Sequence, residues 1–196
     1  MTRSFAITFD YLCPFARIAN ETVVAALDAG LDWDVDFRPF SLSQTKVEEG
    51  GVAAWERPPG AEGTRGVLAL AWGIAARDEF PDHFRSFHVA LYDARFADTR
   101  DIEDETVLAD VASAVGLDAD AVAAHVATGI PIDTLAREHA ELVKRWAVFG
   151  VPTFISGDEA VFVRLMERDR RDDVERVLDM LEWTDLNEFK RTRVPR

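Results

Sequence analysis

A single cysteine that stands between an apolar stretch and a proline is the feature that most constrains how this chain folds. Residues 5–9 are almost all β-branched or aromatic, Cys13 and Pro14 follow, and residues 17–27 carry apolar side chains at spacings of three and four. The first pattern predicts a strand and the last a helix. Proline is favoured in the first turn of a helix, where its missing N–H would be unpaired anyway, so Pro14 marks the helix start and Cys13 its N-cap.

This position has a chemical consequence for the sulfur of Cys13. A thiol at a helix N-terminus faces unpaired backbone N–H groups and the positive end of the helix dipole, and both stabilise a thiolate. We therefore expect the pKa of Cys13 to lie below its usual value of about 8.5, and the sulfur to act as a nucleophile. The alternative is a buried, inert cysteine, which is the commoner state of a lone cysteine.

Three neighbours of Cys13 are candidate site residues. Asp10 could accept a proton, although an ionised carboxylate would raise the pKa of the thiol, and a solvated turn carboxylate is the alternative. Arg17 could offer positive charge to a thiolate, or it could be a solvated helix residue. Phe15 could shield the sulfur or contact substrate, or it could pack as an ordinary core phenylalanine.

The rest of the chain reads as two parts of one fold, separated by a long helical segment. Gly30 fits a helix C-cap, and residues 31–40 alternate acidic with apolar side chains, which predicts a second, parallel strand. Residues 41–63 are polar and rich in Gly and Pro, which predicts a loop. The helices predicted after this loop are 67–77, 82–96, 102–115, 118–128 and 132–148.

A strand signal returns only near the C-terminal end. Residues 150–156 and 160–163 flank a Gly-Asp-Glu turn and predict a β-hairpin, and residues 172–183 predict a last amphipathic helix. The predicted fold class is therefore α/β. Its sheet-forming part comprises residues 1–44 and 149–183, the inserted helical subdomain comprises residues 45–148, and residues 184–196 form a tail.

Composition narrows the classes of partner. The 36 acidic and 22 basic residues give a net charge of −14, which repels phosphate backbones and anionic membranes, so we expect neither nucleic acid nor membrane as a partner. No run approaches the ~18 apolar residues of a membrane span, and no secretory signal is recognisable, so we expect the cytoplasm. The four histidines have no metal-ligand spacing, so no metal site is predicted.

The assembled order resembles the thioredoxin fold in its DsbA-like form, in which a helical domain follows the second strand. The resemblance rests on the Cys13-Pro14-Phe15-Ala16 turn and on the Val-Pro-Thr-Phe segment that begins at Val151, and it covers residues 5 to about 183. The chain is most similar to the cytoplasmic branch, which includes FrnE-type oxidoreductases, hydroxychromene-carboxylate isomerases and kappa-class glutathione transferases. The abundance of Ala, Asp, Arg and Val is typical of a high-GC bacterium.

The resemblance implies that the Val151–Pro152 peptide bond is cis and that it faces the sulfur. The backbone of Val151, Pro152 and Thr153 would then pair with an extended substrate, and Pro14 and Phe15 would form the other side of the site. The alternative is an ordinary trans proline at the start of a strand.

One departure from the family pattern limits the chemistry. Redox members carry Cys-x-x-Cys, whereas Ala16 stands where the second thiol would be. The resemblance then implies a monothiol disulfide oxidoreductase or reductase without a bound cofactor, in which glutathione or mycothiol resolves a mixed disulfide between Cys13 and a small-molecule or protein substrate. A homodimer is compatible with this assignment.

Two further functions stay open. One is a small-thiol-dependent isomerase or transferase, although that branch commonly has serine where Cys13 stands. The other is a site that has lost turnover and kept only thiol binding.

Overall fold

The strand, helix and strand predicted around Cys13 form a parallel β-α-β unit. In the computed structural model, which describes residues 2–187, β1 (Arg3–Phe9) leads into α1 (Pro14–Asp28) and then into β2 (Trp33–Pro39). The two strands pair in parallel along their whole length. The C-cap of α1 is Ala29, one residue before the predicted Gly30, which follows with a φ of +84° that glycine adopts without strain.

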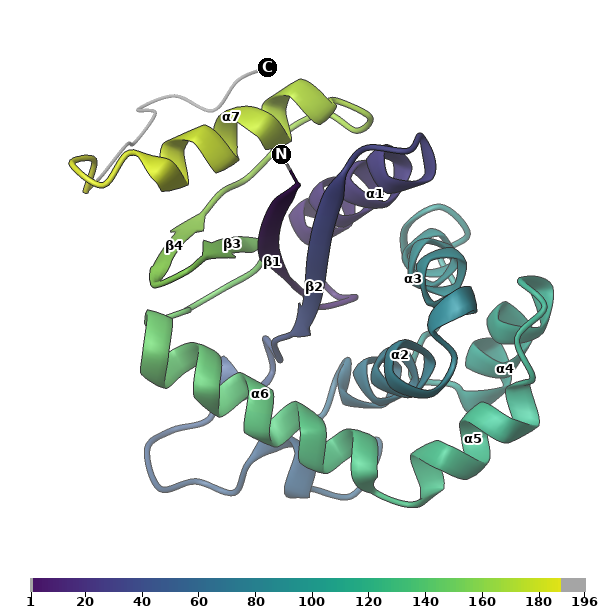
Figure 1. The fold of residues 1–196 in the computed structure, drawn as a ribbon. Coiled ribbons are helices and arrows are strands. Elements are labelled where there is room, and N and C mark those ends of the chain that lie inside the picture. The colour runs from purple at the N-terminus through teal and green to yellow at the C-terminus, as the bar shows by residue number, and fades with distance from the viewer. Residues whose placement is uncertain (1, 188–196) are drawn as a thin grey trace.

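The hairpin near the C-terminal end completes a four-stranded sheet. β3 (Thr153–Ser156) pairs antiparallel with both β1 and β4 (Glu159–Phe162), so the strand order is β2-β1-β3-β4. The predicted hairpin is thereby confirmed. Figure 1 shows how β1 ends beside the segment that leads from the inserted helices into β3.

Five helices separate β2 from β3, and a last helix follows β4. Their bounds are α2 (Val67–Glu79), α3 (Pro81–Phe96), α4 (Glu105–Ala114), α5 (Ala119–Ala127), α6 (Ile130–Trp146) and α7 (Arg171–Glu182). Two of the predicted ends were wrong for local reasons. The side chain of Asp104 caps the N-terminus of α4 by accepting from the N–H of Thr106, and Ala147 takes a left-handed conformation that ends α6.

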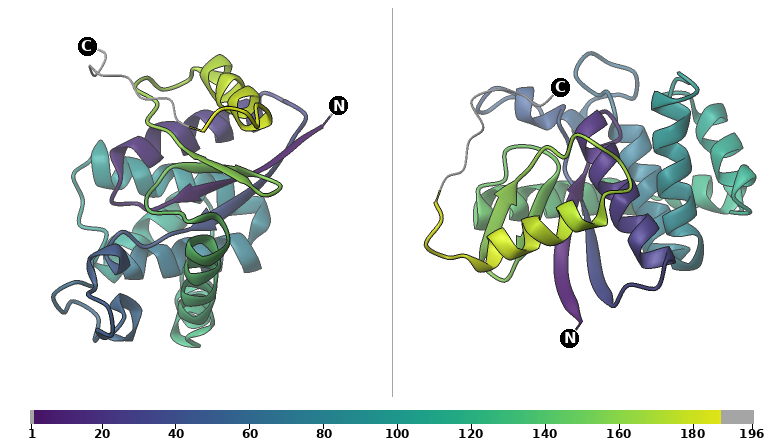
Figure 2. Two further views of the ribbon diagram at one scale, coloured as in Figure 1. Left: turned by 90° about the vertical axis from the view of Figure 1, so that its left-hand side faces the viewer. Right: turned by 90° about the horizontal axis from the view of Figure 1, so that it is seen from above.

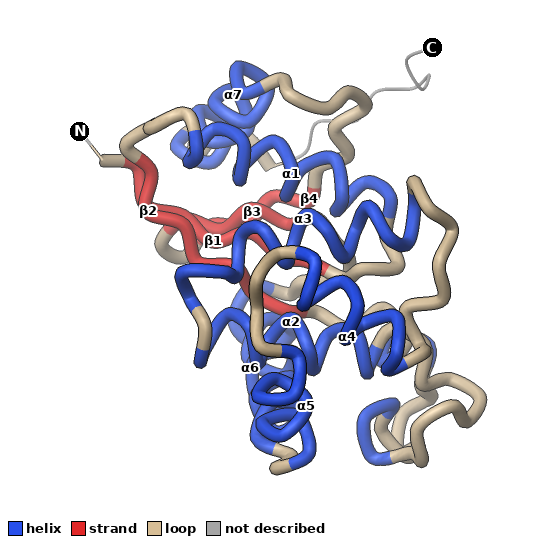
Figure 3. Tube along the Cα trace, turned by 90° about the vertical axis from the view of Figure 1, so that its right-hand side faces the viewer, coloured by secondary structure: helices blue, strands red, loops and turns tan. Residues whose placement is uncertain are grey.

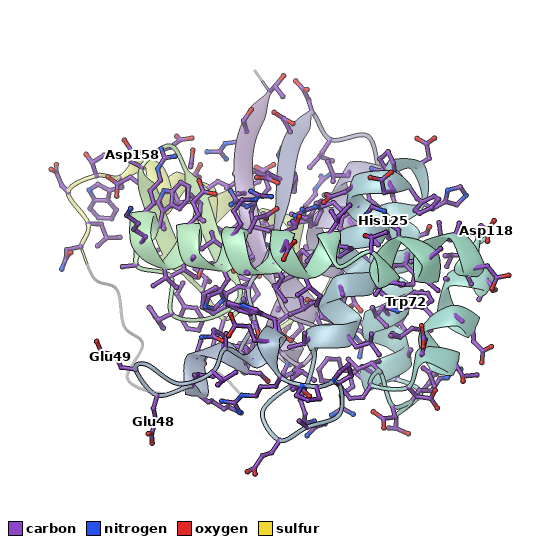
Figure 4. All side chains as sticks on the ribbon, turned by 90° about the horizontal axis from the view of Figure 1, so that it is seen from below. Glu48, Glu49, Trp72, Asp118, His125 and Asp158 are labelled. Carbon is purple, nitrogen blue, oxygen red and sulfur yellow. The ribbon has the colours of Figure 1, made fainter. Side chains whose placement is uncertain are left out.

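Helices cover both faces of the sheet. Figure 3 shows α1 and α7 on one side of the sheet and α2 and α6 on the other, and Figure 2 shows α7 lying over the β3–β4 hairpin next to α1. Seen from below, α6 crosses this end of the molecule, and Glu48 and Glu49 point outward from the loop that precedes α2 (Figure 4). That loop contains two short 3-10 turns, Gln44–Lys46 and Ala54–Glu56.

One hydrophobic core joins the sheet to the inserted helices. It contains side chains of β1 such as Phe9, of α2 such as Trp72 and of α6 such as Leu142, all of them fully buried. Residues 184–187 are irregular, and the remainder of the predicted tail lies outside the described residues. Within residues 2–187, no helix is both long and apolar enough to span a membrane.

Candidate active site

The turn between β1 and α1 places the sulfur of Cys13 at the helix N-terminus, as the sequence predicts. Cys13 is the N-cap of α1, and its Sγ accepts a hydrogen bond from the N–H of Ala16 at 3.4 Å. The turn itself is closed by a backbone bond from the N–H of Cys13 to the carbonyl of Asp10, at 3.1 Å. The sulfur is therefore held by hydrogen bonds on its own helix and by the chain that precedes it.

The second side of the site comes from the segment that leads into β3. The Val151–Pro152 peptide bond is cis, the isomer expected there. The thiol of Cys13 donates to the carbonyl oxygen of Val151 at 3.3 Å, across 138 residues of sequence. The N–H of Val151 has no hydrogen-bond acceptor within the described part of the chain.

Thr153 faces inward. It is 3% exposed, its N–H donates to the hydroxyl of Thr8 at 2.8 Å, and its own hydroxyl donates to the carbonyl of Gly150 at 2.8 Å. Both of its donors are used within the protein. Thr153 therefore orients the Val151–Pro152 segment, whereas Pro14 is exposed at the surface beside Cys13.

The predicted direction of the Cys13 pKa shift was wrong. Burial raises the pKa of the thiol, since only 9% of the residue is exposed, and the N–H groups of Ala16 and Phe15 lower it without cancelling that effect. The carboxyl of Asp10 raises this pKa further and the guanidinium of Arg164 lowers it. The raised pKa favours the thiol form of Cys13, whose S–H donates to the carbonyl of Val151.

Asp10 is a buried structural acid and not a solvated turn residue. Its two carboxylate oxygens accept from the N–H groups of Leu12 and Leu42, at 2.8 and 2.7 Å, so it ties the Cys13 turn to the chain that leaves β2. Complete burial raises the pKa of Asp10 to about 6, and these two bonds oppose the shift. The sequence could not show this burial, because Leu42 approaches only in the fold.

Arg17 does not offer its charge to the sulfur. Its guanidinium pairs with Glu21 at 2.6 Å and also with Asp93 on α3. The cation that acts on Cys13 is Arg164, an exposed residue after β4, whose guanidinium carbon lies 5.2 Å from the centre of the Phe15 ring. Sequence reasoning missed Arg164, because a lone arginine in a loop carries no periodic or motif signal.

A series of buried hydrogen bonds holds the turn between β1 and α1. The hydroxyl of Tyr11 bonds to Nδ1 of His88 at 2.8 Å, and Nε2 of His88 bonds to the side-chain oxygen of Asn20 at 3.1 Å. The amide of Asn20 in turn donates to the carbonyls of Thr8 and Ala16. Burial lowers the pKa of His88 to about 3, so the ring is neutral. Both ring nitrogens are occupied, so His88 is not a catalytic partner of Cys13.

Among the described residues, neither the surface hollows nor the acidic side chains indicate a second functional site. One hollow of about 430 Å³ lies on the sheet beside Trp146, and another of about 440 Å³ lies over the ion pairs of Glu138; neither is lined by Cys13. No group of three or more His, Cys, Asp or Glu side chains in residues 2–187 could hold a metal.

Comparisons with known proteins agree with this geometry. The family model of the DSBA-like thioredoxin domain matches residues 6–179. A thioredoxin-like oxidoreductase from Silicibacter pomeroyi DSS-3 is 22% identical with a TM-score of 0.60, over 90% of this chain and 86% of that one. A 2-hydroxychromene-2-carboxylate isomerase is 17% identical with a TM-score of 0.64, over 94% of this chain and 100% of that one.

The cytosolic disulfide reductase DsbM from Pseudomonas aeruginosa, solved with GSH, is 17% identical with a TM-score of 0.63, over 92% of this chain and 99% of that one. At these identities the three solved structures establish a shared fold and not a shared activity. A comparison with curated proteins gives no match.

Proposed function

Because the chain belongs to the family of the DSBA-like thioredoxin domain, we propose that it is a thiol-disulfide oxidoreductase that works through Cys13 alone. The observation that supports this most directly is the contact between Sγ of Cys13 and the carbonyl of Val151, beside a cis proline. It brings the two family motifs together around one sulfur. Ala16, which is fully buried at the position of the second thiol, leaves no internal group to complete the cycle.

The proposed cycle has two exchanges. The Cys13 sulfur, once deprotonated, attacks one sulfur of a disulfide, so that a mixed disulfide forms on Cys13 and the other half leaves as a thiolate that takes up a proton. An external thiol then attacks the mixed disulfide at the substrate sulfur and regenerates Cys13. The net result is that one disulfide is exchanged for another and one thiol is released. Glutathione and mycothiol are the proposed external thiols, and a reducing compartment would supply either.

The experiment compares three forms of the protein that differ at position 16. Wild type, Ala16→Ser and Ala16→Cys are each converted to the mixed disulfide with a small aromatic thiol, and release of that thiol is followed with and without added glutathione. We expect wild type and Ala16→Ser to release it only with glutathione, and Ala16→Cys to release it without. The serine variant matches the cysteine variant in added bulk, so it controls for disturbance of the buried position.

Two results would refute the proposal. One is a Cys13→Ala variant that exchanges disulfides as fast as wild type. The other is a mixed disulfide on Cys13 that no external thiol releases, which would point to a protein that binds thiols without turnover.

A second candidate function is supported by the protonation state of Cys13. A small-thiol-dependent isomerase can use a hydrogen-bond donor beside a bound thiolate, and the S–H of Cys13, whose pKa is raised, becomes such a donor when it leaves the carbonyl of Val151. Activity that requires bound glutathione and forms no mixed disulfide on Cys13 would favour this function over the first. Mass spectrometry of the intact protein during turnover distinguishes the two.

A further inference from the structure

The loop between β4 and α7 brings a cation to the rim of the Cys13 site. Arg164 is exposed, and its guanidinium carbon lies 5.2 Å from the ring centre of Phe15 and 5.6 Å from that of Phe162. Phe15 follows Cys13 by two residues in the first turn of α1. The positive charge of Arg164 therefore lies between the cysteine turn and the last strand of the sheet.

The backbone on both sides of Arg164 is fixed. The N–H of Val163 donates to the carbonyl of Pro152 at 3.2 Å, and Leu165 is buried in the core. Further along the loop, Arg168 pairs with Glu21 of α1 at 3.2 Å. An anchored backbone keeps the Arg164 side chain near the sulfur, so less entropy is lost when it binds a ligand.

Within the described residues, the charge of Arg164 has no partner of opposite sign. No carboxylate among residues 2–187 pairs with Arg164, whereas Arg168 and Arg170 of the same loop pair with Glu21 and Glu167. The whole chain carries a net charge of −14, which repels a small anion over most of its surface. A free guanidinium beside the reactive sulfur gives such an anion one local point of attraction.

Aromatic surface continues from Arg164 through Phe162 to Phe149. The Phe162 ring lies 4.9 Å from that of Phe149, which is 69% exposed and directly precedes the Gly150–Val151 segment. A guanidinium between aromatic rings offers charge to a carboxylate and apolar surface to the carbon chain that bears it.

We infer that Arg164 is a specificity-determining residue that binds a carboxylate of the small thiol or small disulfide whose sulfur reacts with Cys13. The inference rests on the proposed function, and it names the substrate class as anionic low-molecular-weight disulfides. It favours glutathione, which carries carboxylates, over mycothiol, which is uncharged. Phe15 and Phe162 contact the apolar part of the same ligand.

The test uses pairs of reagents of similar size, of which one is anionic and the other neutral. Iodoacetate and iodoacetamide alkylate Cys13 directly, and dithiodiglycolate and bis(hydroxyethyl) disulfide form mixed disulfides with it; both rates are measured by mass spectrometry of the intact protein. The quantity of interest is the rate ratio of the anionic to the neutral reagent. Any change in the pKa of Cys13 affects both reagents alike and cancels in this ratio.

The variants are Arg164→Gln, Arg164→Lys and Arg176→Gln. Arg176 is an exposed residue of α7 that pairs with Asp173, so its variant changes the net charge equally without touching the site. We expect Arg164→Gln to lower both ratios by about two- to fivefold, the upper part of the range for one exposed ion pair. Arg164→Lys keeps most of the ratio, and Arg176→Gln leaves it unchanged.

Equal ratios in Arg164→Gln and Arg176→Gln would overturn the inference, and so would a lysine variant that behaves like the glutamine variant. These outcomes are separate from failure of the proposed function. If no disulfide reacts with Cys13, the proposed function fails, and the two alkylating reagents still decide whether Arg164 attracts a carboxylate.

Discussion

Gly73 of α2 offers a sharp test of how the inserted helices hold the cysteine turn. A Cβ added at Gly73 would overlap the hydroxyl oxygen of Tyr11 and lie 2.8 Å from its Cε2, a separation that real Cβ atoms do not tolerate. Tyr11 is fully buried and its hydroxyl bonds to His88 at 2.8 Å, so the ring cannot retreat without breaking that bond. Gly73→Ala therefore displaces the Tyr11 ring within a packed core, which both strains the packing and breaks the bond to His88.

The size of the effect follows from three contributions. Overpacking a core costs about 1–3 kcal/mol, and a buried hydrogen-bonding group left without its partner costs about 1–3 kcal/mol. Replacing glycine by alanine inside a helix returns about 1 kcal/mol through backbone propensity. We expect Gly73→Ala to lower the free energy of unfolding by about 3 kcal/mol.

The assay is urea denaturation followed by tryptophan fluorescence, with Tyr11→Phe completing a double-mutant cycle. Tyr11→Phe alone costs about 1–2 kcal/mol, because Nδ1 of His88 loses its partner. In the Gly73→Ala background the same change removes the colliding oxygen, so its cost disappears. The two changes should therefore be coupled by at least about 1 kcal/mol. Gly73→Ala as stable as wild type, or effects that simply add, would refute this reasoning.

Three further outcomes follow from other parts of the structure. Burial of Cys13 predicts an iodoacetamide rate that rises with pH to a midpoint above the ordinary thiol range, and a midpoint below about 8.5 would contradict it. The raised pKa of Asp10, about 6, means that the folded state holds this proton more tightly than the unfolded state. The stabilising contribution of this proton is therefore full at low pH and is lost as the pH rises through 6. Relative to Asp10→Asn, wild type should lose about 3 kcal/mol of unfolding free energy between acid and neutral pH. A difference between the two proteins that stays constant with pH would exclude this. Glu138→Gln removes the carboxylate that pairs with Arg38 and Arg77. We therefore expect the free energy of unfolding, measured by urea denaturation, to fall by about 3 kcal/mol while the alkylation rate at Cys13 stays unchanged. A fall of less than about 1 kcal/mol would show that the pairs contribute little to stability.

Local patterns predicted the elements around the site well, because they depend on neighbours in sequence. The apolar spacing after Pro14 and the alternation in residues 31–40 gave the helix and the strand, and the side chain of Cys13 caps α1 as expected. The ends of α4 and α6 were misplaced by a few residues, since Asp104 and Ala147 decide them through their own conformations.

The electrostatics of the site could not be predicted in the same way. The local sequence shows that Cys13 lies at a helix N-terminus, but it does not show that the residue is buried beside Val151, which is 138 residues away. Burial has the larger effect on the thiol pKa. Asp10 and Arg17 also find their partners only in the fold, the first at Leu42 and the second on α3.

The absence of a second cysteine and the burial of the first lead to one joint consequence for the proposed cycle. In a dithiol enzyme, the first cysteine attacks the substrate disulfide, and the second cysteine then attacks the mixed disulfide and releases the substrate. Ala16 stands at the second position, and its methyl group cannot attack a mixed disulfide. The disulfide must therefore reach the sulfur of the largely buried Cys13, and the resolving thiol must reach the substrate sulfur bound to it, both past Phe15 and Arg164. A residue that selects for charge at this rim then acts twice in each turnover. We expect that replacing Arg164 slows both half-reactions when both reagents are anionic, and only one of them when a single reagent carries the charge.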